Sequence, residues 1–162
     1  MSAAAHAAKL GMSHFLLEKT DHLSDSIYKY QKGKHVMATP SDLQLRGGGY
    51  EEGVAAGCQF EEGKRETILG IWNRHCGLEN PEIPTFEGEV DTLDVNVKLN
   101  AEVTGVEGEK GAYEIKTKLG ETYRAETIIL GIGTQCNPNK LRCPGADHPM
   151  ITPLLDDPED HV

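Results

Sequence analysis

The chain has 162 residues and a mass of 17.7 kDa, enough for one globular domain with its own core. Its composition, 38% apolar and 26% charged, is that of a globular protein, and no apolar run is long enough to span a bilayer, so we expect no membrane partner. Acidic residues outnumber basic ones by 26 to 16, for a formal charge of -10. This charge repels phosphate backbones, and we expect no nucleic-acid partner.

The cysteines are spaced unlike a redox pair or a structural zinc site. We therefore predict free thiols at all four positions, which are Cys58, Cys76, Cys136 and Cys143. Cys136, Cys143 and His148 lie close in sequence but fit no standard ligand pattern, so we expect no metal. The N-terminus lacks the basic start and long apolar segment of a signal peptide, which indicates the reducing cytoplasm.

The first 18 residues are predicted to form a helix and then a strand. Five of the eight residues 3–10 are alanine, which favours a helix, and Gly11 provides its end. Phe15, Leu16 and Leu17 are followed by Glu18, a pattern typical of a buried parallel strand with an acid at its carboxyl end. Such a helix normally follows another strand in a βαβ unit. We expect that first strand and its turn to be missing.

The middle of the chain is predicted to hold one helix between two irregular stretches. Residues 19–57 show no clear period and are predicted to be mostly loop. Residues 64–75 place four apolar side chains on one helical face. Residues 77–92 contain two prolines and five acids, which indicates an exposed connection.

Three strand patterns follow. Residues 95–103 alternate apolar and polar side chains, which predicts one strand that Gly105 ends. Residues 112–118 and 121–125 predict a β-hairpin. Residues 127–132 form a continuous apolar run, which favours a buried parallel strand. Prolines then interrupt the sequence, and we expect an irregular tail from about residue 135.

This order of elements resembles the first dinucleotide-binding domain of FAD-dependent pyridine-nucleotide oxidoreductases of the thioredoxin-reductase-like group. The most specific part is Ala-Glu-Thr-Ile-Ile-Leu-Gly-Ile-Gly-Thr at residues 125–134, followed by Asn-Pro at 137–138 and Pro-Gly-Ala-Asp at 144–147. It resembles the family's second FAD-proximal strand and its exit loop. The resemblance implies an α/β fold, with residues 1–162 as a single, partial Rossmann-like FAD/NAD(P)-binding domain that carries a small antiparallel β-hairpin.

One family motif is not in this sequence. In the family, Gly-x-Gly-x-x-Gly precedes the first helix and lets the backbone approach the pyrophosphate of the cofactor. We therefore expect the FAD-binding portion of an NAD(P)H-dependent flavoprotein oxidoreductase, truncated at both ends and inactive as this fragment. The alternative is a non-catalytic α/β fragment that acts as an interaction module or is completed by another chain. Either is compatible with a homo-oligomer.

The resemblance also implies binding residues for the adenosine half of FAD. Glu18, with Lys19 beside it, lies where an acid accepts hydrogen bonds from the ribose hydroxyls. The alternative is a solvated charge pair. Val103 and Thr104 correspond to positions whose backbone groups meet the adenine, although the same residues also suit an ordinary strand end.

Near the flavin, the resemblance implies a role for Gly131, Gly133 and Thr134. Glycine permits close approach of the backbone to the phosphoribityl part of the cofactor. The alternative is a tight turn with no ligand. No Cys-x-x-Cys is present, so no dithiol and no catalytic residue is assigned, and any reaction rests on the flavin.

Overall fold

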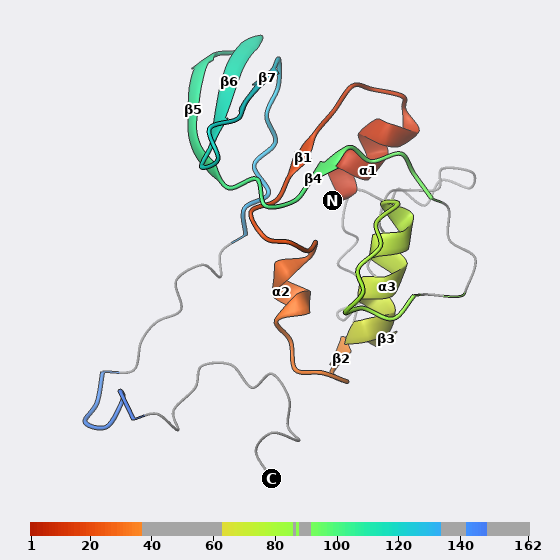
Figure 1. Cartoon of the computed structure of the whole chain (residues 1–162), viewed down its shortest axis with the longest axis vertical. Coiled ribbons are helices and arrows are strands. Elements are labelled where there is room, and N and C mark those ends of the chain that lie inside the picture. Colours follow the sequence, from red (N-terminus) through yellow and green to blue (C-terminus); the bar gives the residue numbers. More distant parts are fainter. Residues whose placement is uncertain (37–62, 86, 88–91, 134–141, 149–162) are drawn as a thin grey trace, which may run out of the picture.

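The computed structural model describes residues 1–36, 63–85, 87, 92–133 and 142–148 of the chain (Figure 1). Its helices and strands, in chain order, are α1 (Ser2–Lys9), β1 (Leu16–Leu17), α2 (Asp25–Tyr28), β2 (His35–Val36), β3 (Gly63–Lys64), α3 (Arg65–His75), β4 (Val97–Lys98), β5 (Val103–Glu109), β6 (Ala112–Thr117) and β7 (Thr122–Ala125). This mixture of helices and small sheets is compatible with the predicted α/β class. The predictions for residues 37–62 and most of those for the tail lie outside the described residues.

The N-terminal helix and strand form where the sequence predicts them, but the strand is not buried as predicted, since Leu16 and Leu17 are half-buried and Phe15 is 46% exposed. β1 pairs in parallel with β4, with Leu16 opposite Val97 and Leu17 opposite Lys98. Figure 1 shows α1 lying alongside this pair. Ala5 of α1 is completely buried in a cluster with Leu23 and Cys76, because small side chains let a helix approach its neighbours closely.

The central helix is also confirmed. α3 buries Ile68, Leu69 and Trp72, and Val36 of β2 packs against this face. β2 and β3 pair antiparallel at its N-terminal end. Neither α2 nor β2 was predicted, because four and two residues are too short to show a period. Among the described residues, no helix has the length and apolar character needed to cross a membrane.

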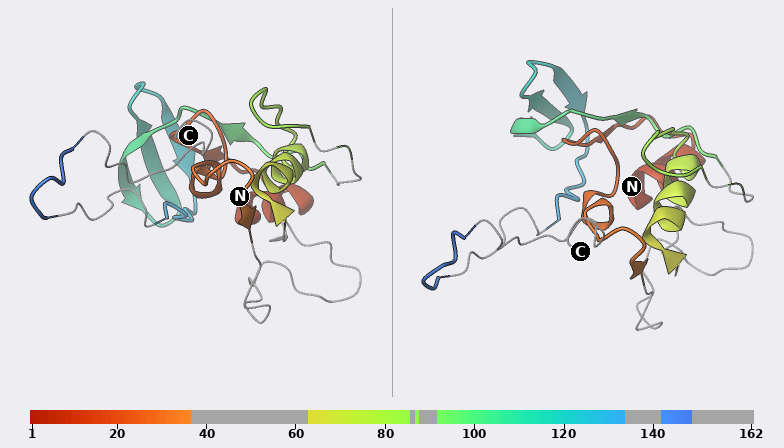
Figure 2. Two further views of the ribbon diagram at one scale, coloured as in Figure 1. Left: turned by 90° about the horizontal axis from the view of Figure 1, so that it is seen from below. Right: turned by 60° about the horizontal axis from the view of Figure 1, so that its bottom comes forward.

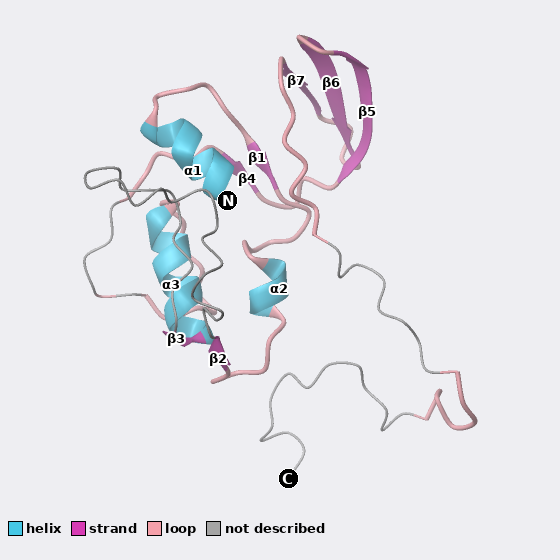
Figure 3. Ribbon diagram, turned by 180° about the vertical axis from the view of Figure 1, so that it is seen from behind, coloured by secondary structure: helices cyan, strands magenta, loops and turns pink. Residues whose placement is uncertain are grey.

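The predicted hairpin is part of a larger sheet. β6 pairs antiparallel with β7 as expected, and β5 pairs antiparallel with the other edge of β6. The prediction that Gly105 ends a strand is therefore wrong, since β5 continues to Glu109 with a register shift between Val103 and Gly105. A local irregularity lets the strand bend there without ending. Figures 2 and 3 show this sheet standing to one side of the helices.

Residues 95–103 do not form one strand. β4 ends at Lys98, and Asn100 adopts a left-handed conformation with φ of 57°, which turns the chain before β5 begins at Val103. Asparagine tolerates this conformation better than most residues. The alternating pattern thus spans two strands that belong to two different sheets.

The predicted buried strand at residues 127–132 is likewise absent. These residues have no regular structure, and Ile129, Leu130 and Ile132 are each more than 70% exposed. A continuous apolar run becomes a parallel strand only where neighbouring strands satisfy its backbone and helices cover its faces. Within the described part of the chain, β1 has β4 as its partner, and no strand pairs with residues 127–132.

Candidate functional site

Glu18 lies directly after β1, at the carboxyl end of the parallel strand pair. Its amide donates a hydrogen bond of 3.0 Å to the carbonyl of Lys98, and its carbonyl accepts one of 2.8 Å from the amide of Ala101. Both backbone groups of Glu18 are therefore held by hydrogen bonds to β4 and to the segment that follows it. In open α/β sheets, the carboxyl ends of the strands are where ligands bind.

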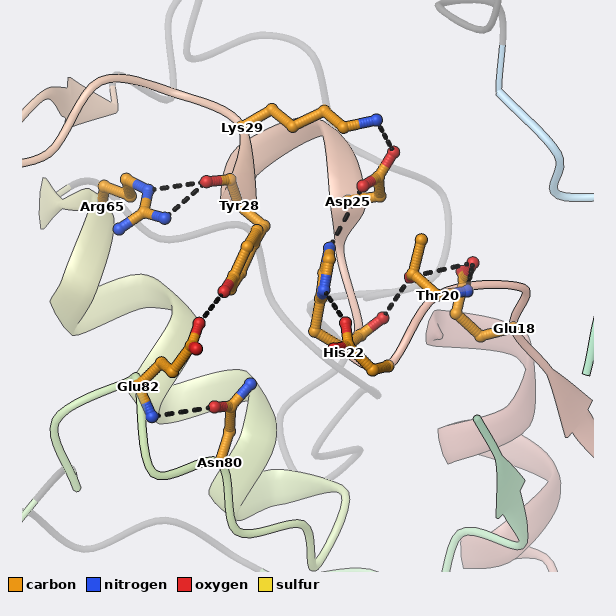
Figure 4. Close-up of polar contacts among 10 residues, drawn as sticks. Glu18, Thr20, His22, Asp25, Tyr28, Lys29, Arg65, Asn80 and Glu82 are labelled. Atoms are coloured by element: carbon orange, nitrogen blue, oxygen red, sulfur yellow. Dashed lines mark hydrogen bonds and ion pairs between the residues drawn. The ribbon is translucent and has the colours of Figure 1, made fainter. Parts of the chain in front are cut away.

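The carboxylate of Glu18 is held on one side only. Its Oε1 atom accepts a hydrogen bond of 3.2 Å from the amide of Thr20 and lies 3.2 Å from the Thr20 hydroxyl (Figure 4). No hydrogen bond to Oε2 is found among the described residues. A half-buried carboxylate with one oxygen engaged retains the capacity to accept hydrogen bonds from a pair of ligand hydroxyls.

The structure brings the predicted adenosine residues into the same region. The hydrogen bond from Ala101 to Glu18 sets the chain leading to Val103 and Thr104 beside the end of β1. Val103 is 42% exposed, whereas the Thr104 hydroxyl donates to the Lys116 carbonyl within the β5–β6 sheet. Lys19 is exposed next to Glu18.

Lys19 also acts on a neighbouring acid. The hydrogen bond from Lys118, 2.8 Å from Nζ to the Glu102 carboxylate, is the main cause that lowers the pKa of Glu102, and the charge of Lys19 adds a smaller effect. Two lysines therefore lie close to the start of β5, where the charge of Lys118 is balanced by its ion pair with Glu102.

The predicted flavin-side residues are not joined to Glu18. Gly131 and Gly133 lie in the exposed segment after β7, with no atom near the position of an added side chain. Gly133 has a φ of +66°, which glycine adopts without strain. No hydrogen bond in the described part of the chain connects either glycine to Glu18. Thr134 lies outside the described residues.

A polar cluster around His22 was not predicted. His22 Nδ1 lies 2.7 Å from Asp21 Oδ1, and Nε2 lies 3.1 Å from Asp25 Oδ1. The ring stacks on Tyr28, with centroids 3.6 Å apart and planes 17° from parallel. In the protonated form, both ring nitrogens donate, one to each aspartate. We call His22, Asp21, Asp25 and Tyr28 the His22 clamp.

The His22 clamp is anchored to α3 and to its own helix. Burial raises the pKa of Asp25, but hydrogen bonds from Lys29 and His22 outweigh it and leave that pKa below its usual value. The hydroxyl of Tyr28 donates to Glu82, which raises the pKa of Tyr28 to about 12. Arg65 Nε donates a bond of 3.0 Å to the Tyr28 carbonyl. The sequence contained a trace of this cluster in the i,i+4 spacing of Asp25 and Lys29.

Metal and disulfide chemistry find no support in the described residues. Cys76 is buried and Cys143 is exposed, and neither forms a disulfide, as predicted. Cys58 and Cys136 lie outside the described part. Within that part, no three histidine, cysteine, aspartate or glutamate side chains gather closely enough to hold a metal ion.

The described elements combine helices with small sheets, and one parallel strand pair carries a positioned acid at its carboxyl end. The model of the pyridine nucleotide-disulphide oxidoreductase family matches residues 1–160. The chain belongs to this family of flavin-dependent oxidoreductases, which confirms the resemblance seen in the sequence. A search of curated proteins found no match.

Proposed function

We propose that this chain supplies the FAD-binding part of an NAD(P)H-dependent flavoprotein oxidoreductase, with a Rossmann-like arrangement of its strands. The observation that carries the proposal is the fixed position of Glu18. Its backbone is held by Lys98 and Ala101, and only one of its carboxylate oxygens is engaged. A carboxylate in this position suits the two hydroxyls of the adenosine ribose.

The other binding roles follow from the same orientation of the cofactor. Backbone groups of Val103 and Thr104 receive the adenine, and Lys19 adds positive charge beside the ribose. Gly131, Gly133 and Thr134 let the backbone approach the phosphoribityl chain. The exposure of Val103, Gly131 and Gly133 supports this assignment, since their surfaces are accessible to a ligand.

The donor set fits FAD only in part. The acid for the ribose is in place, but the sequence contains no Gly-x-Gly-x-x-Gly to cradle the pyrophosphate. When bound, the flavin supplies hydride transfer with a nicotinamide cofactor. The residues of this chain bind and orient the cofactor, and none is assigned to proton or hydride transfer. We therefore expect the chain by itself to be catalytically inactive.

Titration with FAD tests the role of Glu18. The 15N-labelled full chain is titrated and its amide resonances are followed, because this method measures dissociation constants into the millimolar range. Removing the charge in Glu18→Gln should weaken binding roughly 5- to 100-fold, the equivalent of about 1–3 kcal/mol for a hydrogen bond to a charged group. Glu79→Gln, at an exposed position after α3, is the matched control. Equal affinities for Glu18→Gln and the wild type would contradict the proposal.

A second candidate function is an interaction module completed by another chain. It is favoured by the exposed apolar segment at Ile129, Leu130 and Ile132, because contiguous exposed apolar surface marks interaction sites. Light scattering with size-exclusion chromatography tests whether this segment drives association between chains.

A further inference from the structure

Two groups of Thr20, its backbone amide and its hydroxyl, contact the carboxylate of Glu18. The Thr20 amide donates to Glu18 Oε1 at 3.2 Å, and the Thr20 hydroxyl oxygen lies 3.2 Å from the same atom. Thr20 is itself fixed to the turn that follows β4, because its carbonyl accepts a hydrogen bond of 2.9 Å from the amide of Asn100. Residues 18–20 thus form a short turn that is closed by the hydrogen bond between the Thr20 amide and the Glu18 carboxylate.

The hydroxyl of Thr20 has a second and shorter contact. Its Oγ1 donates to the carbonyl of His22 at 2.7 Å. A hydroxyl has one proton to donate, and the shorter distance indicates that it donates to the His22 carbonyl. The hydrogen bond to Glu18 then comes from the Thr20 amide. The side chain of Thr20 therefore fixes the turn in which its own amide points at the carboxylate.

The far side of this turn is held rigidly. The His22 side chain is only 10% exposed, and it is packed between Asp21 and Asp25 and stacked on Tyr28 (Figure 4). The carbonyl that accepts the hydrogen bond from the Thr20 hydroxyl belongs to this immobilised residue. The side chain of Thr20 therefore links the fixed His22 to the turn that holds the Glu18 carboxylate.

We propose that Thr20 is a positioning residue for the cofactor site: its hydroxyl, anchored on the carbonyl of His22, holds its amide against Oε1 of Glu18 and so leaves Oε2 for the ribose. The inference rests on the proposed role of Glu18. A carboxylate held in one rotamer binds more tightly than a mobile one, since less conformational entropy is lost when the ligand arrives.

The test compares a substitution that removes the hydroxyl with one that keeps it. Thr20→Val keeps the shape and the amide but loses the hydroxyl, whereas Thr20→Ser keeps the hydroxyl. FAD is titrated into the 15N-labelled full chain of each variant. We expect Thr20→Val to weaken binding about three- to tenfold and Thr20→Ser to stay within twofold of the wild type. On a Glu18→Gln background, Thr20→Val should add no further loss.

A measurement without ligand separates this inference from the proposed function. A hydrogen bond to a charged carboxylate moves an amide proton downfield, so the residue-20 resonance should move upfield in Glu18→Gln and in Thr20→Val but not in Thr20→Ser. If Glu18→Gln leaves FAD affinity unchanged, the proposed function fails, and the amide shifts alone decide whether Thr20 holds the carboxylate.

Three results would overturn the positioning role. The first is a Thr20→Val chain that binds FAD as the wild type does while Glu18→Gln binds weakly. The second is an equal loss from Thr20→Val with and without Glu18→Gln, which would indicate general damage to the fold. The third is a residue-20 amide resonance that does not respond to Glu18→Gln.

Discussion

The carbonyl of Glu18 accepts a hydrogen bond of 2.8 Å from the amide of Ala101. This bond joins the end of β1 to the chain that enters β5, although 83 residues separate the two positions in sequence. It explains how an acid near the N-terminus and the backbone leading to Val103 come to lie close together. The candidate site is therefore brought together by contacts between distant segments and not by local sequence.

We predict that the chain binds FAD with a dissociation constant far above that of a flavoprotein with the glycine motif. The sequence lacks the glycine motif that brings backbone amides to the pyrophosphate. The flavin absorbance of the purified protein and the quenching of FAD fluorescence during titration measure this. A yellow protein that retains one flavin per chain through purification would contradict the prediction.

We predict that Gly108→Ala destabilises the β5–β7 sheet. Gly108 has a φ of +95°, and an added Cβ would lie 2.3 Å from the carbonyl oxygen of Ala112. Strain of this kind costs about 1–3 kcal/mol of unfolding free energy, which urea denaturation measures.

Gly105→Ala is the matched control for this strand. Gly105 lies in β5 with no atom near the added Cβ and no positive φ, so its substitution should change the midpoint little. Equal midpoints for Gly108→Ala and Gly105→Ala would show that the turn between β5 and β6 relaxes freely.

Local periodicity was sufficient to predict several elements. The alanine run gave α1, and the apolar face of Ile68, Leu69 and Trp72 gave α3, because both patterns reflect contacts made within one turn of helix. The division between β4 and β5 was not predictable, since it depends on the left-handed conformation of Asn100.

The remaining errors share a different cause. Residues 127–132 have a strand-like composition, but a strand requires a partner that the sequence pattern cannot guarantee. The His22 clamp lies within residues 21–28, but Glu82 and Arg65, which hold Tyr28, come from distant positions and could not be predicted from local sequence. Glu18 was identified only through family resemblance, and its support by Thr20 emerged from the structure.

We predict that stability falls in acid through Asp25 and Glu66. Hydrogen bonds from Lys29 and His22 hold the pKa of Asp25 below its ordinary value against the opposing effect of burial. Glu66 is held in the same direction, again against burial, by the Gly33 amide and Arg65. A folded-state pKa below that of the unfolded chain contributes stability above the unfolded pKa, and this stability is lost as pH falls through the folded pKa.

The measurement is the urea midpoint between pH 7 and pH 3. Below the ordinary values of 3.8 for Asp25 and 4.5 for Glu66, the wild type should lose stability progressively. The double variant Asp25→Asn/Glu66→Gln should be less stable at pH 7, and its urea midpoint should fall less steeply as the pH decreases. Parallel curves for the two proteins would show that these carboxylates do not determine the acid sensitivity.

The last prediction concerns association. Ile129, Leu130 and Ile132 are exposed in a segment that pairs with no described strand. The amides of residues 16 and 18 donate to carbonyls of the β4 segment, so the amide of Leu17 between them faces the other edge of β1, which has no partner strand among the described residues. Exposed apolar segments and open strand edges favour contact between chains. We expect the purified chain to form dimers or larger species, which size-exclusion chromatography with light scattering detects.

Substitutions in the apolar segment test whether this segment causes the association. Ile129→Lys/Leu130→Lys should shift the population toward the monomer, because a charge on each side chain disfavours an apolar contact. Leu119→Lys, at a position equally exposed in the turn between β6 and β7, is the control and should leave association unchanged. A monodisperse wild-type monomer with a sharp, reversible thermal transition would contradict the prediction. It would also show that the exposed segment at Ile129, Leu130 and Ile132 does not bring copies of the chain together.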